Sequence, residues 1–244
     1  MATPGFLVPD WPVPARVRAA VTTRRGGVSR GPFADFNLGT HVGDDAATVA
    51  DNRARLATAL GLPAAPAWLE QVHGTAVAVL PRKTPGAADA AVTFSPGEVC
   101  AVLVADCLPV FLASRAGDRV GIAHTGWRGL AGGVVEATVA ALDCDPRMLV
   151  AWLGPAIGPH AFEVGDEVRE AFVARDGGAA AAFREGRDGR WHADLPALAR
   201  RRLAVLGVGD VLGDSPCTYS DPERYFSYRR DGATGRMAAL AWLA

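Results

Sequence analysis

Cysteine is scarce in this sequence, with four residues among 244. So few thiols in a chain of this length do not form a disulfide scaffold, and an even count alone does not imply bridges. An excess of charge of one sign is also absent, because 25 lysines and arginines balance 26 aspartates and glutamates. Without a basic field, the chain is expected to bind neither nucleic acid nor a membrane surface in bulk.

Long hydrophobic runs are lacking as well. No uncharged apolar run reaches the roughly 18 residues of a membrane helix, and the longest candidate, Met148–Pro159, is interrupted by prolines and glycines. The N-terminus has no basic segment, and Pro9, Asp10 and Pro12 interrupt its apolar patch. It is therefore not interpreted as a signal peptide. Since repeats and linkers are missing too, we expect one soluble domain spanning residues 1–244 in a reducing, cytoplasmic setting.

What is present is a globular composition, with 50% hydrophobic and 21% charged residues, which excludes a disordered chain. Capping residues and apolar periodicity predict helices over Ala46–Leu60, Gly129–Leu142, Asp166–Ala174 and Leu195–Leu206. Short apolar runs predict strands over Val17–Thr22, Ala67–Gln71, Ala76–Leu80, Ala88–Phe94, Val99–Ala105, Val110–Ser114, Arg119–Ala123, Met148–Leu153, Tyr225–Ser227 and Met237–Leu243. Helices and strands that interleave so irregularly favour an α+β or mixed α/β fold.

Three residues with metal-ligating side chains stand at strand ends or in glycine-bearing loops: His73, Cys107 and His124. Such loops are where sites form on sheet scaffolds. Two imidazoles and one thiolate suit Zn²⁺, and three protein ligands leave a fourth position for water, as in catalytic zinc sites. The long spacings match no zinc-finger pattern. Two other interpretations therefore stay open: a buried strand cysteine beside hydrogen-bonded loop histidines, and a metal-free Cys–His nucleophile pair.

Seven segments carry a more specific signal: TTRRGGVS (22–29), FNLGTHVGD (36–44), LEQVHG (69–74), ADCLPV (105–110), HTGWRG (124–129), LGPAIG (153–158) and CTY (217–219) through FSYRRD (226–231). In these segments the chain resembles the bacterial purine-nucleoside-cleaving family, which has also been called the laccase-domain, polyphenol-oxidase or peptidoglycan-editing family. The segments lie in the family's order and cover nearly the whole chain. One departure is Thr125, where the family more often has alanine.

The resemblance implies a single α+β domain in which a β-sandwich of mixed sheets is flanked by helices. It implies that His73, Cys107 and His124 are the zinc ligands and the catalytic residues. The implied activities are phosphorolysis of adenosine, inosine, guanosine and methylthioadenosine, together with deamination of adenosine. Copper-dependent phenol oxidation and removal of L-serine from peptidoglycan precursors have also been linked to the family. The implied partners are purine nucleosides and phosphate, and both a monomer and a homodimer stay open.

The histidine count bears on the oxidase activity. A four-copper laccase consumes roughly ten histidines, and this chain has five, so a four-copper enzyme is excluded. A single His–Cys–His site can still bind copper, which outranks zinc in raw affinity. Deamination fits zinc, which lowers the pKa of bound water toward about 7, but it also needs a carboxylate that moves protons. Asp106, beside Cys107, and Asp89 are the two candidates.

Phosphorolysis needs cationic groups for phosphate, and the guanidinium fork of arginine matches two phosphate oxygens. Arg24, Arg128, Arg229 and Arg230 are candidates because they lie in the matching segments, and Arg128 also stands at an expected helix start. Asn37 and His41 occupy a glycine-rich loop and are expected to contribute to the substrate pocket.

Two hypotheses from other classes remain. In the first, Cys107 is the nucleophile and His124 the base of a hydrolase that acts on a peptidoglycan precursor. In the second, the protein is a non-catalytic interaction module that zinc stabilises.

Overall fold

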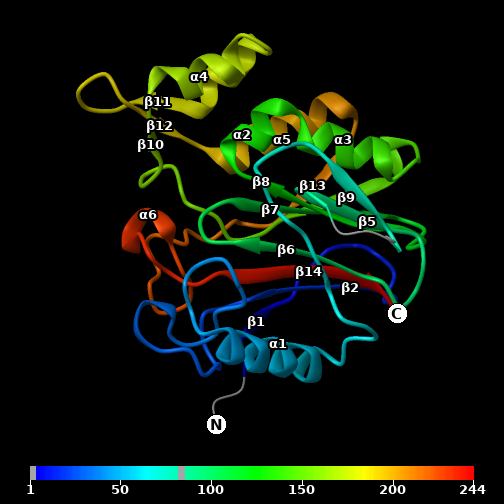
Figure 1. Ribbon diagram of the computed structural model, residues 1–244. Coiled ribbons are helices and arrows are strands. Elements are labelled where there is room, and N and C mark those ends of the chain that lie inside the picture. Colours follow the sequence, from blue (N-terminus) through cyan, green and yellow to red (C-terminus); the bar gives the residue numbers. More distant parts are fainter. Residues whose placement is uncertain (1–3, 82–85) are drawn as a thin grey trace.

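Two mixed β-sheets stacked face to face form the centre of the computed structural model, which describes residues 4–81 and 86–244 (Figure 1). One sheet has five strands in the order β1-β2-β14-β6-β3, and the other has six in the order β13-β9-β7-β8-β5-β4. Their bounds are β1 (Phe6–Leu7), β2 (Val17–Thr22), β3 (Ala67–Trp68), β4 (Val77–Leu80), β5 (Ala90–Thr93), β6 (Val99–Val104), β7 (Leu108–Ser114), β8 (Val120–Thr125), β9 (Leu149–Leu153), β13 (Asp210–Leu212) and β14 (Met237–Leu243).

Helices cover the outer face of each sheet (Figure 1). Helix α1 (Ala46–Leu60) packs on the five-stranded sheet, whereas α3 (Val134–Ala141) and α5 (Leu195–Leu206) pack on the six-stranded one. The remaining elements are α2 (Trp127–Gly132), α4 (Asp166–Val173), α6 (Tyr228–Asp231), the 3₁₀ turns Gly31–Phe33, Pro146–Met148 and Gly177–Ala182, and a small sheet of β10 (Glu163–Val164), β12 (Trp191–Ala193) and β11 (Phe183–Glu185).

Alternating side chains explain why the strand sequences are apolar throughout. In β6, Cys100 and Val102 face the layer between the two sheets, whereas Ala101 faces the α1 side. In β7, Phe111 faces the same inner layer, whereas Val110 packs with the α3 and α5 side. Strands covered on both faces lose the alternation of polar and apolar residues. The layers therefore run helix, sheet, sheet, helix, and the expected α+β sandwich flanked by helices is confirmed.

The helix expected over Gly129–Leu142 is wrong as a single element. It begins earlier, at Trp127, and is divided into α2 and α3 by Gly133, whose φ is 109°. Glycine adopts this left-handed conformation at no steric cost. The division turns α3 back over the six-stranded sheet and leaves the short α2 beside the loop that follows β8.

The strand expected over Tyr225–Ser227 is also wrong. Tyr225 and Phe226 are fully buried but unpaired with any described strand, and Ser227 caps α6 by accepting a hydrogen bond from the N–H of Arg230. Buried aromatic residues resemble a strand in sequence whether or not a neighbouring strand is present. Of the other expected strands, those over Val17–Thr22 and Met237–Leu243 have the bounds of β2 and β14. The rest exist with shifted ends, most clearly the one expected over Ala67–Gln71, of which β3 keeps two residues.

None of the helices in residues 4–81 and 86–244 combines the length and the apolar character that crossing a membrane requires.

Candidate metal centre

His73, Cys107 and His124 meet at one end of the sandwich. Cys107 lies where the chain crosses from β6 in one sheet to β7 in the other, and His124 lies near the end of β8. His73 belongs to the loop between β3 and β4. Their ligand atoms all lie within 4.8 Å of one another, and Cys107 Sγ is 3.8 Å from His73 Nε2. The structure therefore brings together the three residues expected from strand ends and glycine-bearing loops.

Two residues at this junction have left-handed backbone conformations, His73 with φ 59° and Asp106 with φ 93°. Non-glycine residues rarely adopt positive φ, and when they do they cluster at functional sites. Asp106 lies in a turn after β6, where side chains no longer alternate between the two faces of a sheet. The directions of the Asp106 and Cys107 side chains are therefore set by this turn and not by a regular strand. The site thus carries local backbone strain that the surrounding packing must hold.

Asp89, just before β5, orients two of the three residues. Its fully buried carboxylate accepts a 2.8 Å hydrogen bond from His124 Nδ1 and bonds from the backbone N–H groups of Val72, His73 and Gly74. A carboxylate on Nδ1 fixes the ring and leaves Nε2 for a metal. Burial alone would raise the pKa of Asp89, but His124 and the N–H donors outweigh it and keep the pKa below its usual value.

The electrostatics favour a charged Cys107–His124 pair. Burial opposes ionisation of the Cys107 thiol, but the neighbouring His124 and His73 outweigh burial and lower the pKa to about 6. Burial likewise disfavours protonated His124, yet the Cys107 thiolate and Asp89 raise the pKa of that imidazole to about 9. At neutral pH Cys107 is therefore mainly thiolate, which is the form that binds metals and attacks electrophiles.

Asp106, the other candidate for moving protons, is fully engaged elsewhere. Its carboxylate accepts a 2.6 Å bond from the Thr218 hydroxyl and a 2.7 Å bond from the N–H of Arg229, and its carbonyl oxygen accepts from the N–H of Ile157. These contacts connect two loops and helix α6 around the site. The arrangement gives Asp106 a role in holding the walls, and Asp89 a role in orienting ligands.

Two cavities meet at the trio and share His73, Ala105, Cys107, Arg128 and Tyr228. The first, about 140 Å³, is closed mainly by apolar and aromatic side chains, among them Trp127, Ile157, Phe162 and Leu195. The second, about 430 Å³, is lined on its far side by His41, Gln71 and Arg236. For convenience we call them the apolar cavity and the cationic cavity. Cys107 and His73 lie at their junction.

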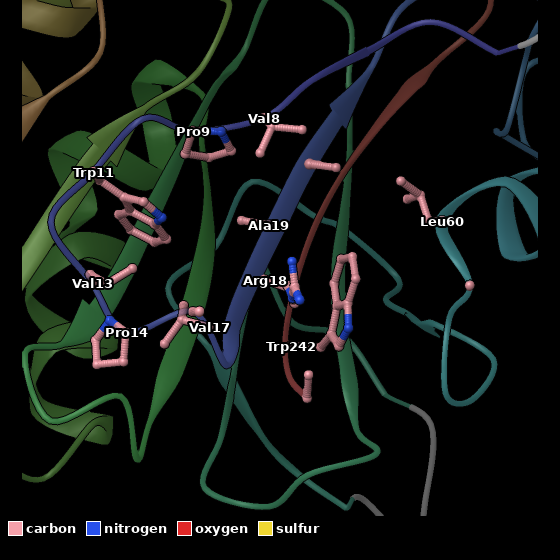
Figure 2. Close-up of a pocket in the computed structure, with 14 residues that line it drawn as sticks. Val8, Pro9, Trp11, Val13, Pro14, Val17, Arg18, Ala19, Leu60 and Trp242 are labelled. Atoms are coloured by element: carbon pink, nitrogen blue, oxygen red, sulfur yellow. The ribbon is translucent and has the colours of Figure 1, made fainter.

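A larger cavity, about 600 Å³, lies elsewhere, between the N-terminal segment around Trp11 and the region of Leu60 and Trp242 (Figure 2). Among the described residues that line it, none is a histidine or cysteine or has a carboxylate side chain. Although it is larger, this cavity is therefore not lined by the side-chain types on which the chemistry expected of His73, Cys107 and His124 depends.

The expected substrate residues divide into two groups. His41, Arg128 and Arg229 line the two cavities, and their contact with substrate stays a prediction. Arg24 and Asn37 are not among the lining residues. Arg24 donates to the carbonyls of Ala34 and Pro222, and Asn37 binds the Asp44 carboxylate and the backbone of Gly39 and Arg236. Direct contact of these two with substrate is not supported by this arrangement.

Sequence reasoning missed Arg236, Tyr228 and Gln71 as lining residues. Tyr228 and Gln71 lie inside segments that carried the resemblance, so a signal for them was available. Arg236 lies outside those segments and reaches the cationic cavity because it immediately precedes β14. Only the sheet order brings it beside a cysteine more than a hundred positions away.

The donor set fits a metal ion such as zinc. Zinc bonds of about 2.0–2.3 Å in a tetrahedral arrangement place ligand atoms roughly 3.3–3.8 Å apart, and the Cys107–His73 distance of 3.8 Å lies in that range. Cys107 as thiolate is the form that ligation needs. Asp89 on Nδ1 leaves Nε2 of His124 for a metal, which displaces the proton that the charged pair keeps there. Three protein ligands leave one position for water or substrate.

Gly126 leaves room for this trio, and Gly126→Ala is expected to weaken metal binding by about 10- to 100-fold. A Cβ there would lie 2.7 Å from His73 Cδ2 and 3.0 Å from Cys107 Sγ. Its φ of −63° suits alanine, so the effect is steric. Metal titration checks it against Gly177→Ala, where a Cβ meets open space. Equal metal affinities in Gly126→Ala and Gly177→Ala would show that the trio can move to accommodate the added Cβ.

The fold and the site define a two-sheet sandwich protein with a His–Cys–His centre between two cavities. Residues 18–244 match the family described as "Multi-copper polyphenol oxidoreductase laccase". The chain belongs to this family.

Named relatives and solved structures share nearly the whole length. "Purine nucleoside phosphorylase YfiH" of Escherichia coli (strain K12) is 52% identical over 240 residues, covering 98% of each chain. "Purine nucleoside phosphorylase Cgl2154/cg2365" of Corynebacterium glutamicum is 39% identical, covering 93% of this chain and 94% of the relative. The crystal structure of Neisseria meningitidis protein NMB0706 has a TM-score of 0.93 at 49% identity and 98% coverage of both chains. These likenesses confirm the family that the sequence segments indicated.

Proposed function

We propose that this protein is a zinc-dependent purine nucleoside phosphorylase that also deaminates adenosine. The observation that carries the proposal is the position of the His73–Cys107–His124 trio at the junction of an apolar and a cationic cavity. The relatives named purine nucleoside phosphorylase support the reaction class. Adenosine, inosine, guanosine and methylthioadenosine are the proposed substrates. The proposal includes a cytoplasmic enzyme, active as a monomer or a homodimer, in which residues 1–244 act as one domain.

Phosphorolysis moves a ribosyl group from a purine to phosphate. A phosphate oxygen forms a bond to C1′, the C1′–N9 bond breaks, and the purine keeps the bonding electrons and gains the proton that hydrogen phosphate loses. A planar purine suits the apolar cavity, where Tyr228 and Trp127 offer aromatic surfaces and Ile157, Phe162 and Leu195 exclude water. In this arrangement the bond that breaks lies at the junction.

His73, Cys107 and His124 would hold the zinc ion, and Asp89 would keep His124 in its ligating tautomer. When bound, zinc would supply Lewis acidity toward an atom of the substrate or a water placed at its open position. Because the same family is described as a laccase, copper is the alternative metal, and the five histidines still exclude a four-copper centre.

A Cys–His hydrolase acting on a peptidoglycan precursor is the second candidate, and one observation favours it. Cys107 is mainly thiolate at neutral pH and lies beside His124, the arrangement of a nucleophile and its base. This candidate predicts turnover that chelators do not stop and covalent trapping of Cys107. The phosphorylase predicts neither.

Product analysis tests the proposal. Purified protein of measured metal content is incubated with adenosine, with and without phosphate, and the products are separated by chromatography. We expect adenine only when phosphate is present, and inosine as the mark of deamination. His160→Gln is a suitable control, because His160 is exposed and its ring contacts Arg184 away from the trio. A folded, zinc-loaded sample that releases neither product would transfer support to the hydrolase.

A further inference from the structure

The cationic cavity contains positive groups without acidic partners. Among the described residues that line it, Arg128 and Arg236 carry the positive charge, His41 adds an imidazole, and none has a carboxylate side chain. Arg236 is half-buried, and burial lowers the pKa of its guanidinium. Its Nη1 donates to the carbonyls of Thr234 and Gly235. Among the described residues, no hydrogen bond holds its Nε or Nη2, so two donors of the planar group stay available.

The nearby negative groups do not neutralise this cluster. The Cys107 thiolate and Asp106 both stabilise the charge of Arg236 electrostatically. Cys107 is the thiolate that a metal would take, however, and both carboxylate oxygens of Asp106 are occupied by Thr218 and Arg229. Burial first, and then repulsion by Arg236 and Arg53, lowers the pKa of His41. Two guanidinium groups that line one cavity, as Arg128 and Arg236 do, favour an anion there.

We propose that the cationic cavity binds an inorganic oxyanion of the phosphate class, held by the guanidinium groups of Arg236 and Arg128 with His41 at its edge. A guanidinium presents two parallel N–H groups that match two oxygens of one phosphate. The cavity shares Cys107 and His73 with the apolar cavity. An anion here and a purine there would therefore approach the same point from two sides.

This inference rests on the proposed function for the identity of the anion, which is the phosphate co-substrate. It adds a division of the site: Arg236, in the cationic cavity, and Arg128, at the junction, determine phosphate affinity, and the rest of the apolar cavity determines base affinity. Arg229 lies on the other side, where its guanidinium donates to the carbonyl of Glu163 and stacks over Phe162. We accordingly assign Arg229 to the wall of the apolar cavity rather than to phosphate.

Calorimetric titration of the purified protein, at measured metal content, with inorganic phosphate tests the site directly. Loss of one charge-assisted contact is expected to weaken phosphate binding by about 10- to 100-fold in Arg236→Met and in Arg128→Met. Arg236→Lys keeps the charge without the fork and is expected to lie in between. Arg187→Met is the matched control, because Arg187 is exposed in the β11–β12 hairpin, and it is expected to bind phosphate as the native protein does.

Two further measurements separate the possible outcomes. In steady-state assays the KM for phosphate should rise with the loss of binding, while the KM for inosine changes by less than about threefold in Arg236→Met, because Arg236 lines the cationic cavity and not the apolar one. Titration with acetate identifies a carboxylate ligand, since an arginine fork accepts either anion. Phosphate affinity that is unchanged in both methionine variants, or acetate binding as tight as phosphate binding, would overturn the proposal.

The inference and the proposed function fail in different ways. Arginine-dependent phosphate binding in a protein that cleaves no nucleoside would support the anion site and refute the phosphorylase. Phosphorolysis with an unchanged KM for phosphate in both variants would support the phosphorylase and refute the anion site. If loss of the two carbonyl contacts unfolds Arg236→Met, Arg128→Met gives the answer, because its guanidinium lies over the Trp127 ring at the surface of α2.

Discussion

Cys107→Ala is expected to lose zinc and to abolish both phosphorolysis and deamination. Structural zinc sites with four ligands bind with about 10–16 kcal/mol, so one ligand contributes roughly 3–4 kcal/mol and its loss weakens binding by about 10²- to 10³-fold. The same change removes the thiolate beside His124. We therefore expect the rate of adenine release to fall by at least about 10³-fold when zinc is limiting. Metal analysis after dialysis and chromatographic rate measurement check the two effects.

A matched control is available in the chain. Cys144→Ala removes a half-buried thiol that packs near the end of α3, away from the trio, and is expected to keep zinc and activity. His124→Ala should reproduce the loss seen in Cys107→Ala, because both residues belong to one ligand set. Native-like activity in either ligand variant would contradict the assignment of the trio as the catalytic centre.

Activity that the native protein keeps after chelation of its metal would indicate a different role for Cys107. If Cys107→Ala is inactive but a chelated native protein still turns over, the cysteine acts as a nucleophile and the metal is dispensable. That result would favour the Cys–His hydrolase, in which a thiolate of pKa about 6 attacks directly. The pair of measurements, variant and chelation, thus distinguishes ligand from nucleophile.

Local signals were enough to place some elements of the fold. The helices expected over Ala46–Leu60 and Leu195–Leu206 have the observed bounds. Their ends depend on neighbouring residues: Asp45 and Asp194 cap the N-termini through their side chains, and Gly61 and Gly207 end the helices with positive φ. Such caps are readable in sequence because the interacting groups are within a few positions.

Elements that depend on distant partners were less accessible. β13 is a strand because it pairs in parallel with β9, and β10 because it pairs with β12. Neither has a distinctive apolar pattern of its own. The Tyr225–Ser227 segment shows the opposite case, in which a buried aromatic pattern exists without a described strand partner. Strand pairing is a property of tertiary structure, and short runs do not determine it.

Some residues of the candidate site were likewise predictable from local sequence, whereas others depend on strand pairing. His73, Cys107 and His124 were identifiable because their residue types and their strand-end positions are local features. The contribution of Arg236 was not, since β14 carries it to the cavity by pairing with β6. Asp106 looked like a proton-moving candidate in sequence, but its positive φ and its contacts with Thr218 and Arg229 give it a structural position.

Asp89→Asn is expected to weaken metal binding, although Asp89 is not itself one of the three proposed metal ligands. The buried carboxylate accepts one bond from His124 and three from backbone N–H groups at positions 72–74. An amide presents an N–H₂ donor toward groups that are themselves donors, so part of this network must break. Loss of a carboxylate that orients a ligating histidine typically costs about 10- to 100-fold in metal affinity. Each hydrogen bond to the charged carboxylate that is lost is expected to lower the unfolding free energy by about 1.5–3 kcal/mol.

Acid titration gives this prediction a second, independent readout. The pKa of Asp89 is lower in the folded protein than its ordinary value of 3.8. A carboxyl with a depressed folded pKa stabilises the native state above its unfolded pKa, and that contribution disappears as the pH falls through the folded pKa. The unfolding free energy of the native protein should therefore drop on acidification below about pH 4, and that of Asp89→Asn should drop less. Asp51→Asn, at an exposed position on α1, should follow the native curve. If Asp89→Asn instead binds zinc normally and shows the native acid curve, the His124 ring is held by its packing alone and the carboxylate has no part in orienting it.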